Sequence, residues 1–248
     1  VIHEDIHNNL WIGTDDGLNL FDRNTKSFTR FVNNPNDQFS LPANRIFEII
    51  EDKTGNLWIG TYGKGMCLFD QVTRKFSSYV LSDSEITRLY PTTVSEDVRR
   101  RAQCNQVRSL FMFDDSHLWV GSEAGIAIFN ISTHTYDRAM YPTGSPNGLA
   151  EARVFSMCDD LRGNLWIGIY DGSLDVYNRA TGTIQHYTPN ERDPYAFASI
   201  QPKCILRDRG GNMWIGTNGK GVQVYFQSTS TILHLRRSER PGVGNKTL

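Results

Sequence analysis

The sequence lacks the cysteine patterns that bind metals or carry out thiol redox chemistry. Its 248 residues include only four cysteines, and no two of them form a CxxC pair. A zinc ribbon or a thioredoxin-like site is therefore not expected. Because free cysteine is among the most often buried residue types, we expect unpaired thiols that serve as small core residues, at Cys67, Cys104, Cys158 and Cys204.

An excess of one charge is also missing. Lys and Arg number 26, against 27 Asp and Glu. Nucleic-acid binding driven by bulk charge needs a concentrated basic surface, so no nucleic-acid partner is expected for this segment. The sequence has no run of about eighteen apolar residues, the length that spans a bilayer as a helix. Any membrane attachment would therefore need a helix outside these residues.

Motifs for catalysis are absent as well. Neither a Gly-rich phosphate loop nor a G-x-S-x-G nucleophile elbow occurs, and the six histidines fall in expected turns and strands instead of a cluster. His3 and His7 have the i, i+4 spacing of a helical metal site, but a strand is expected to end between them. We therefore expect no catalytic residue, no metal and no cofactor.

What the sequence does contain is an internal repeat. All five tryptophans lie in one short motif, and successive tryptophans are 47, 61, 47 and 48 positions apart. One unit is thus about 48 residues long, and the second spacing carries an insertion. The five copies are Leu10-Trp11-Ile12-Gly13, Leu57-Trp58-Ile59-Gly60, Leu118-Trp119-Val120-Gly121, Leu165-Trp166-Ile167-Gly168 and Met213-Trp214-Ile215-Gly216.

The same residue types surround each tryptophan. Four copies have an aspartate six positions earlier, followed by a turn that ends in Asn, whereas the third copy has Phe113 there. Gly and Asn tolerate the positive φ of tight hairpins. After the Trp segment come a loop and an alternating run that ends in an aromatic residue, which predicts a strand. The aspartates are Asp5, Asp52, Asp160 and Asp208, and the runs end at Phe21, Phe69, Phe129, Tyr177 and Tyr225.

Four short antiparallel strands in a repeat of this length are typical of a β-propeller blade. We therefore predict an all-β chain, a β-propeller of four-stranded antiparallel blades with the five tryptophans in equivalent positions. The blades are expected at about residues 1–35, 41–81, 105–141, 150–190 and 200–236, with an insertion at about 82–104. An all-α solenoid is excluded because no segment sustains a helical period and glycine interrupts every unit.

The unit from Glu51 to Tyr79 resembles the two-component regulator propeller repeat. The resemblance rests on Asp52, Gly55-Asn56-Leu57-Trp58-Ile59-Gly60-Thr61, Phe69-Asp70, Thr73, Phe76 and Tyr79, and it recurs along nearly the whole chain. It implies the periplasmic sensor region of an inner-membrane hybrid two-component receptor whose parent chain is a histidine kinase. It also implies an oligosaccharide or other small-molecule ligand, and a homodimer formed through the parent receptor.

In this family such propellers have seven blades. Seven units would need about 340 residues, so we expect that further blades complete the propeller rather than a closed ring of five.

The topology of a blade indicates where a ligand would bind. The loops after the Trp strands share one face of the propeller with the segments that enter the innermost strands, and these loops differ between blades while the framework repeats. Thirteen positions before each Trp, basic and amide side chains alternate and are expected to ring the channel mouth. Arginine forks and amides suit sugar hydroxyls, uronates and sulfates, and tyrosines can stack on pyranose rings. The ring is Arg45, Gln106, Arg153 and Gln201, and the loops add Tyr62, Lys64, Tyr170, Asp171 and Lys220.

Other interpretations remain open at this point. The ring could be ordinary solvated channel lining. A lyase-like or glycan-cleaving propeller would need acidic residues close together, and Asp15, Asp16, Glu123 and Asp171 come from separate blades. A protein-interaction propeller is a third class. The charged insertion, with Glu96-Asp97-Val98-Arg99-Arg100-Arg101, is either a solvated segment or a lid or partner contact on the loop face.

Overall fold

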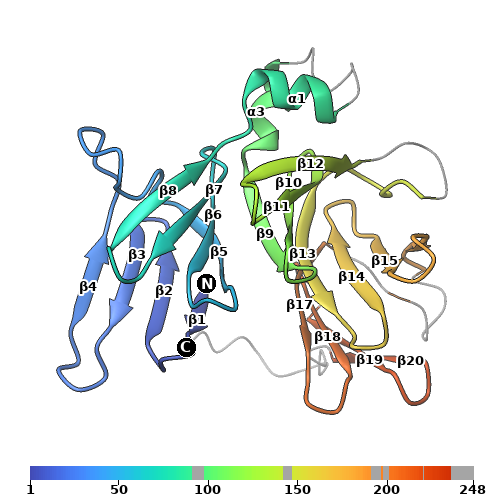
Figure 1. Cartoon of the computed structure of the whole chain (residues 1–248). Coiled ribbons are helices and arrows are strands. Elements are labelled where there is room, and N and C mark those ends of the chain that lie inside the picture. The colour runs from blue at the N-terminus through green and yellow to red at the C-terminus, as the bar shows by residue number, and fades with distance from the viewer. Residues whose placement is uncertain (91–97, 142–146, 191–196, 198–200, 220, 236–248) are drawn as a thin grey trace, which may run out of the picture.

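A computed structural model shows five four-stranded antiparallel sheets, each built from strands consecutive in sequence (Figure 1). The structure describes residues 1–90, 98–141, 147–190, 197, 201–219 and 221–235. The predicted all-β propeller fold is confirmed. The sheets are blade 1, β1 (Ile2–Glu4), β2 (Leu10–Thr14), β3 (Gly17–Phe21) and β4 (Phe28–Phe31); blade 2, β5 (Ile46–Glu51), β6 (Leu57–Thr61), β7 (Met66–Asp70) and β8 (Lys75–Tyr79); blade 3, β9 (Val107–Met112), β10 (His117–Ser122), β11 (Gly125–Asn130) and β12 (Thr135–Met140); blade 4, β13 (Val154–Asp159), β14 (Asn164–Ile169), β15 (Leu174–Asn178) and β16 (Ile184–Tyr187); and blade 5, β17 (Pro202–Arg207), β18 (Met213–Thr217), β19 (Val222–Phe226) and β20 (Thr231–Leu235).

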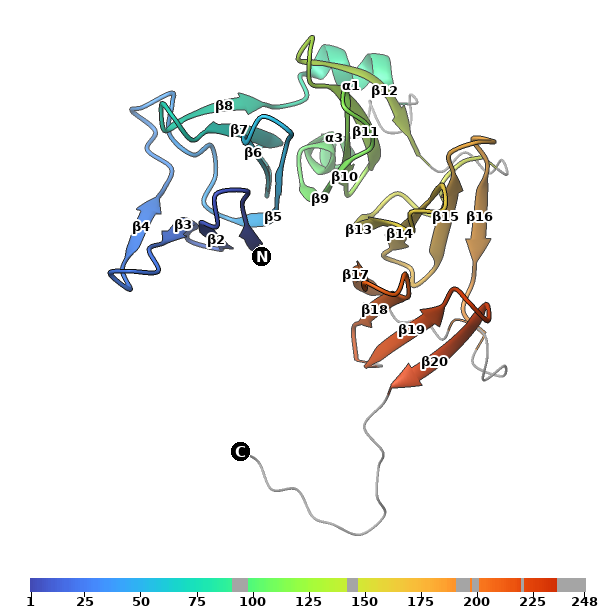
Figure 2. The same ribbon diagram turned by 60° about the horizontal axis from the view of Figure 1, so that its bottom comes forward.

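The blades are arranged as an arc around a central axis (Figure 2). The first strand of each blade lies innermost, and the innermost strands of neighbouring blades contact one another. The tryptophans occupy the second strand of every blade, each opposite a residue of the innermost strand and a residue of the third strand. For example, Trp58 lies opposite Ile50 and Leu68, and Trp214 lies opposite Leu206 and Val224. The predicted equivalence of the five tryptophans is confirmed.

Each repeat aspartate holds its own tryptophan. In blade 2, the Trp58 indole N–H donates to Asp52 at 2.9 Å, and the same carboxylate accepts from the backbone N–H groups of Thr54 and Asn56. Burial raises the pKa of the Asp52 carboxyl, but these hydrogen bonds outweigh it and hold the pKa below its usual value. The aspartate therefore closes the hairpin turn and fixes the indole together, which explains the constant spacing of six. The same indole bond forms at Asp5, Asp160 and Asp208.

The third blade solves the same problem with an aromatic ring. Phe113 stands at the aspartate position and stacks on Trp119, with ring centres 4.5 Å apart and planes only 7° from parallel. The Arg179 guanidinium of the next blade lies 4.5 Å from the centre of the Phe113 ring. The departure from the repeat is therefore filled by packing.

Tryptophan also joins neighbouring blades. The Trp58 ring packs against Phe129, the aromatic residue near the end of the third strand of the next blade, at 5.6 Å between ring centres. The Trp11–Phe69, Trp119–Tyr177 and Trp166–Tyr225 pairs repeat this contact. In blades 1 to 4 the glycine two positions after Trp lets the next blade approach: a Cβ on Gly121 would lie 2.9 Å from a Val154 methyl carbon. The Trp, Gly and aromatic residues of the repeat motif therefore make the contacts between neighbouring blades.

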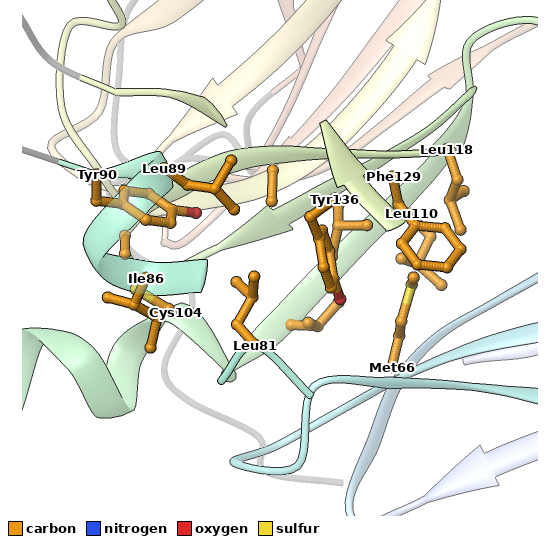
Figure 3. Packing of buried hydrophobic residues seen from close by; sticks show 14 of the residues in the cluster. Met66, Leu81, Ile86, Leu89, Tyr90, Cys104, Leu110, Leu118, Phe129 and Tyr136 are labelled. Atoms are coloured by element: carbon orange, nitrogen blue, oxygen red, sulfur yellow. The ribbon is translucent and has the colours of Figure 1, made fainter. Parts of the chain in front are cut away.

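The insertion contains helices that the sequence interpretation missed. Helix α1 (Asp83–Leu89) begins at a capping box formed by Ser82 and Glu85, and α3 (Val98–Cys104) follows. Ile86, Leu89 and Tyr90 enter the apolar cluster between blades 2 and 3, and α1 packs on β12 (Figure 3). These described parts of the insertion extend the core between two blades, so they are more than a solvated charged segment. The acidic and basic run itself, 96–100, lies outside the described side chains.

The cysteines occupy core or edge positions of the blades. The Cys67 and Cys158 thiols are free and lie in β7 and β13. The free Cys204 thiol lies on β17 and is exposed, so the expected core position is wrong for Cys204. With three of four thiols free, no pair of cysteines in the chain is linked. Cys104 was expected in a loop, but it is the buried last residue of α3. His117, expected in a turn, instead begins β10.

Candidate ligand-binding site

The predicted ring positions and the loops after the Trp strands meet on one face. Arg45, Gln106, Arg153 and Gln201 each directly precede an innermost strand. Their backbone carbonyls anchor the loops: the N–H groups of Tyr62, Tyr170 and Asn218 donate to Arg45, Arg153 and Gln201 at 3.0, 3.0 and 3.2 Å. An isolated bridge pairs Tyr62 with Gln106 of the next blade. The fold therefore brings these candidate positions to the same edge of the propeller.

The two ring arginines are stacked on the loop tyrosines. The guanidinium carbon of Arg153 lies 3.5 Å from the centre of the Tyr170 ring, and that of Arg45 lies 5.1 Å from the Tyr62 ring. Arg45 also pairs with Asp15 of blade 1 at 2.9 Å. Each of these tyrosine rings therefore has an arginine of its own blade over it. A stacked guanidinium keeps its in-plane N–H donors available to a ligand.

The other predicted residues are placed less favourably. Asp171 is exposed, but its carboxylate accepts from the Ser173 N–H at 2.8 Å and so closes its own turn. The Gln201 amide accepts from Asn218 at 3.0 Å. The Gln106 amide oxygen is buried without a hydrogen-bond partner in the described part of the chain. Lys64 is exposed in its loop, and Lys220 lies outside the described residues.

A second layer of the site was missed from the sequence. In four blades the innermost strand has a register shift, so that one residue has no partner on the Trp strand: Phe47, Arg108, Phe155 and Lys203. Such a β-bulge re-aims a side chain and is common beside functional sites. A signal was present, because these residues stand eleven positions before each Trp and alternate aromatic with basic.

The bulge residues and the stacked arginines form one continuous belt. Arg108 lies 4.7 Å from the Phe47 ring centre and 5.2 Å from that of Phe155, so it connects blades 2, 3 and 4. The Lys203 ammonium lies 3.7 Å from the Phe155 ring centre and 5.9 Å from that of Tyr170. We call this set the cation–aromatic belt: Arg45, Phe47, Tyr62, Arg108, Arg153, Phe155, Tyr170 and Lys203.

A central cavity of about 640 Å³ lies against the bulge layer. It is lined from all five blades and includes the four bulge residues, whereas none of the predicted ring residues lines it. Glu48 is its one lining carboxylate among the described residues, and burial raises the pKa of Glu48 to about 7. Burial and the nearby Arg108 lower the pKa of the Lys203 ammonium. The cavity wall therefore carries two cations and a carboxyl group that resists ionisation.

Three of the four acidic residues considered on the loop face have partners for their carboxylates. Asp15 is engaged by Arg45, and Glu123 accepts from the Arg108 Nε at 2.8 Å. Asp171 is held in its turn, as described above. Within the described ranges, no group of three or more His, Cys, Asp or Glu side chains could hold a metal ion.

The profile of a known repeat family, described as "Two component regulator propeller", matches residues 40–63 and 196–219. These segments span the Trp strands of blades 2 and 5, including Trp58 and Trp214. Blades 2 and 5 therefore each contain a segment that matches the two-component regulator propeller repeat.

Solved structures with this propeller fold include extracellular domains of signalling proteins. The chain shares 22% identity and a TM-score of 0.71 with the extracellular domain of a hybrid two-component system of B. thetaiotaomicron, with 96% of this chain and 28% of that chain covered. A second such domain from the same organism gives 23% identity and a TM-score of 0.66, with 87% and 25% covered. PorZ, a surface component of the type IX secretion system of Porphyromonas gingivalis, gives 19% and 0.62, with 96% and 33% covered. These likenesses show the fold.

One curated relative is named as a histidine kinase. Over 125 residues, the chain is 28% identical to Histidine kinase P4 of Formosa agariphila. The matched region covers 50% of this chain and 8% of that protein. The chain therefore spans less than a third of the length of the first solved structure named above and under a tenth of the length of this kinase. In the described part of the chain, no helix is both long and apolar enough to cross a membrane.

Proposed function

We propose that this chain is the ligand-sensing propeller of a two-component receptor and binds an oligosaccharide at the channel mouth, outside the cytoplasm in the periplasm. The observation that carries the proposal is the cation–aromatic belt, which runs through four neighbouring blades on one face. The regulator repeats and the extracellular placement of the similar solved domains support the signalling role.

The belt has the chemistry that a glycan requires. Arginine forks bind vicinal hydroxyls and acidic groups through paired N–H donors, and aromatic rings pack on the C–H face of pyranoses. Tyr62 is 39% exposed, and the Arg45 side chain beside it is half exposed, so both can meet a ligand from solvent. A linear oligosaccharide that follows the belt would contact several blades at once.

Sensing by this site needs no bond chemistry. A ligand that contacts Arg45 in blade 2 and Arg153 in blade 4 favours whichever arrangement of blades and receptor subunits fits it best, and differential affinity alone shifts the population. Asp15, Glu123 and Asp171 of the loop face are engaged in ion pairs or a turn, which supports a binding role over a hydrolytic one. We propose that any kinase activity belongs to the parent chain.

Calorimetric titration with a panel of oligosaccharides tests the proposal. We expect saturable binding without product formation. Arg153→Ala should weaken binding roughly tenfold to a hundredfold, which corresponds to about 1.5–3 kcal/mol for a lost charge-assisted hydrogen bond. Arg23→Ala is the matched control, because Arg23 is an exposed arginine paired with Glu4, remote in the repeat from the loop face.

The panel also separates the competing functions. If Arg153→Ala and Arg45→Ala both fold and bind with unchanged affinity, the belt is ordinary channel lining and the proposed site is wrong. Release of shortened products from the panel would instead indicate a glycan-cleaving propeller. Absence of both binding and turnover would favour a protein partner, a role consistent with the similarity of this fold to a secretion-system surface component.

A further inference from the structure

The charges of the belt are unequally compensated. Three of its four cations have a carboxylate partner: Arg45 pairs with Asp15, Arg108 with Glu123 and Arg153 with Glu151. Among the described residues, no carboxylate lies within ion-pair distance of Lys203. This lysine is therefore the cation of the belt whose charge is left for a ligand.

The surroundings of Lys203 favour an anion. Its ammonium lies over the Phe155 ring and beside the central cavity, where Arg108 adds a second positive charge to the lining. Burial and, after it, repulsion from Arg108 lower the pKa of Lys203, while the Glu123 carboxylate that pairs with Arg108 acts in the opposite direction. An anion placed between the two cations would relieve this repulsion.

The carboxylate that could neutralise the cavity does not do so. Glu48 lines the same cavity, yet it forms no ion pair with Arg108 or Lys203 in the described structure. Burial pushes its pKa to about 7, so near neutral pH a large part of Glu48 is uncharged. The cavity wall accordingly presents net positive charge to whatever enters it.

Resting on the proposed glycan function, we propose that Lys203 and Arg108 form a subsite for an acidic substituent, so that the sensed oligosaccharide is anionic. The substituent is a uronate carboxylate or a sulfate ester. Lys203, held over the Phe155 ring, supplies a point charge, and the Arg108 N–H groups that do not donate to Glu123 supply the directional donors. Arg45 and Arg153 then contact the neutral hydroxyl groups nearer the channel mouth.

Matched ligands test this subsite. The probes are uronate-containing and sulfated tetra- and hexasaccharides, the same compounds after carboxyl reduction or desulfation, and sodium sulfate alone. We expect at least one acidic oligosaccharide to bind ten times more tightly than its neutral counterpart, and Lys203→Gln to remove most of that preference. Lys203→Arg should retain it. Lys75→Gln is the matched control, because Lys75 lies on the outer strand β8 with its ammonium 4.6 Å from the Phe39 ring centre. This substitution should leave the preference for acidic oligosaccharides unchanged.

Each other outcome overturns a defined part of the reasoning. Equal binding of acidic and neutral members would refute the anionic subsite while the glycan-sensing function stands. A preference that survives in Lys203→Gln would place the acidic group elsewhere. Sodium sulfate binding as tightly as the oligosaccharides would identify a free anion as the ligand, and no binding by any probe would overturn the proposed function together with the subsite.

Discussion

The bond between Asp52 and Trp58 can be tested because the repeat provides its own control. Asp52→Ala removes the acceptor of the Trp58 indole N–H, and Trp58 is only 1% exposed, so water cannot replace the lost partner. A buried donor left unpaired costs about 1–3 kcal/mol, and loss of the turn hydrogen bonds from Thr54 and Asn56 adds to this. We expect the free energy of unfolding to fall by about 2–4 kcal/mol.

Asp208→Ala is the matched variant in blade 5. Asp208 accepts the equivalent bonds from two backbone N–H groups, from the Asn212 amide and from Trp214 Nε1 at 2.9 Å, without the Thr54 hydroxyl bond of blade 2, and Trp214 is 36% exposed in this chain. Water can therefore solvate its indole after the substitution, and we expect a clearly smaller loss. The measurement is urea unfolding followed by far-UV circular dichroism, with an unchanged slope as the check that the unfolding reaction is the same. Equal losses at the two positions would refute the burial argument.

Three further predictions follow from local geometry. Gly121→Ala should lower the free energy of unfolding by about 1–3 kcal/mol, because its Cβ would lie 2.9 Å from Val154, and a urea titration that shows no loss would contradict this close packing. The folded protein holds the Glu48 proton up to about pH 7, whereas the unfolded carboxyl, with a pKa near 4.5, releases it earlier. The free energy of unfolding should therefore fall by roughly 3 kcal/mol as pH rises from 4.5 to 7. Glu48→Gln should flatten this part of the plot of unfolding free energy against pH, and an unchanged slope would argue against the raised pKa. Cys204 is exposed whereas Cys67 is fully buried with a raised pKa, so a maleimide should label Cys204 first in the native protein, as mass spectrometry of peptides would show, and early labelling of Cys67 would contradict the packing.

The blade framework could be predicted because its constraints are local and repeat in sequence. The Asp-to-Trp spacing, the glycine after Trp and the terminal aromatic each serve one contact, and that contact recurs in every blade. The third blade shows the limit of this reasoning. Phe113 looked like a lost aspartate, and only the structure shows that it stacks on Trp119 and receives Arg179 from the next blade.

The predicted ring residues lie at the expected edge of the blades, and the layer of bulge residues beside them was not predicted. Counting from Trp placed Arg45 and Arg153 at the entrance to the innermost strands, where they are found. Counting positions could not show that the residues two positions further along, such as Phe47 and Lys203, lie in β-bulges beside the cavity. Pleat alternation assumes an unbroken register, and a bulge changes it locally. Helix α1 was missed for a different reason: the capping box of Ser82 and Glu85 lies in a polar insertion that was interpreted as a loop.

The two layers of the propeller suggest how ligand binding reaches the blade interfaces. Toward the outside, neighbouring blades are locked by Trp–aromatic packing, which is close-fitting and tolerates little displacement. Around the channel, they meet through Arg108 and its two phenylalanine neighbours, and through the pair of Arg45 with Asp15. A ligand anion can replace Asp15 on Arg45 at little cost because the released Asp15 carboxylate is exposed to water, whereas an aromatic interface cannot be exchanged in this way. On the proposed function, a ligand that competes with Asp15 for Arg45 would therefore act on the more adjustable of the two layers, and its binding energy would change how blades 1 and 2 meet at the channel.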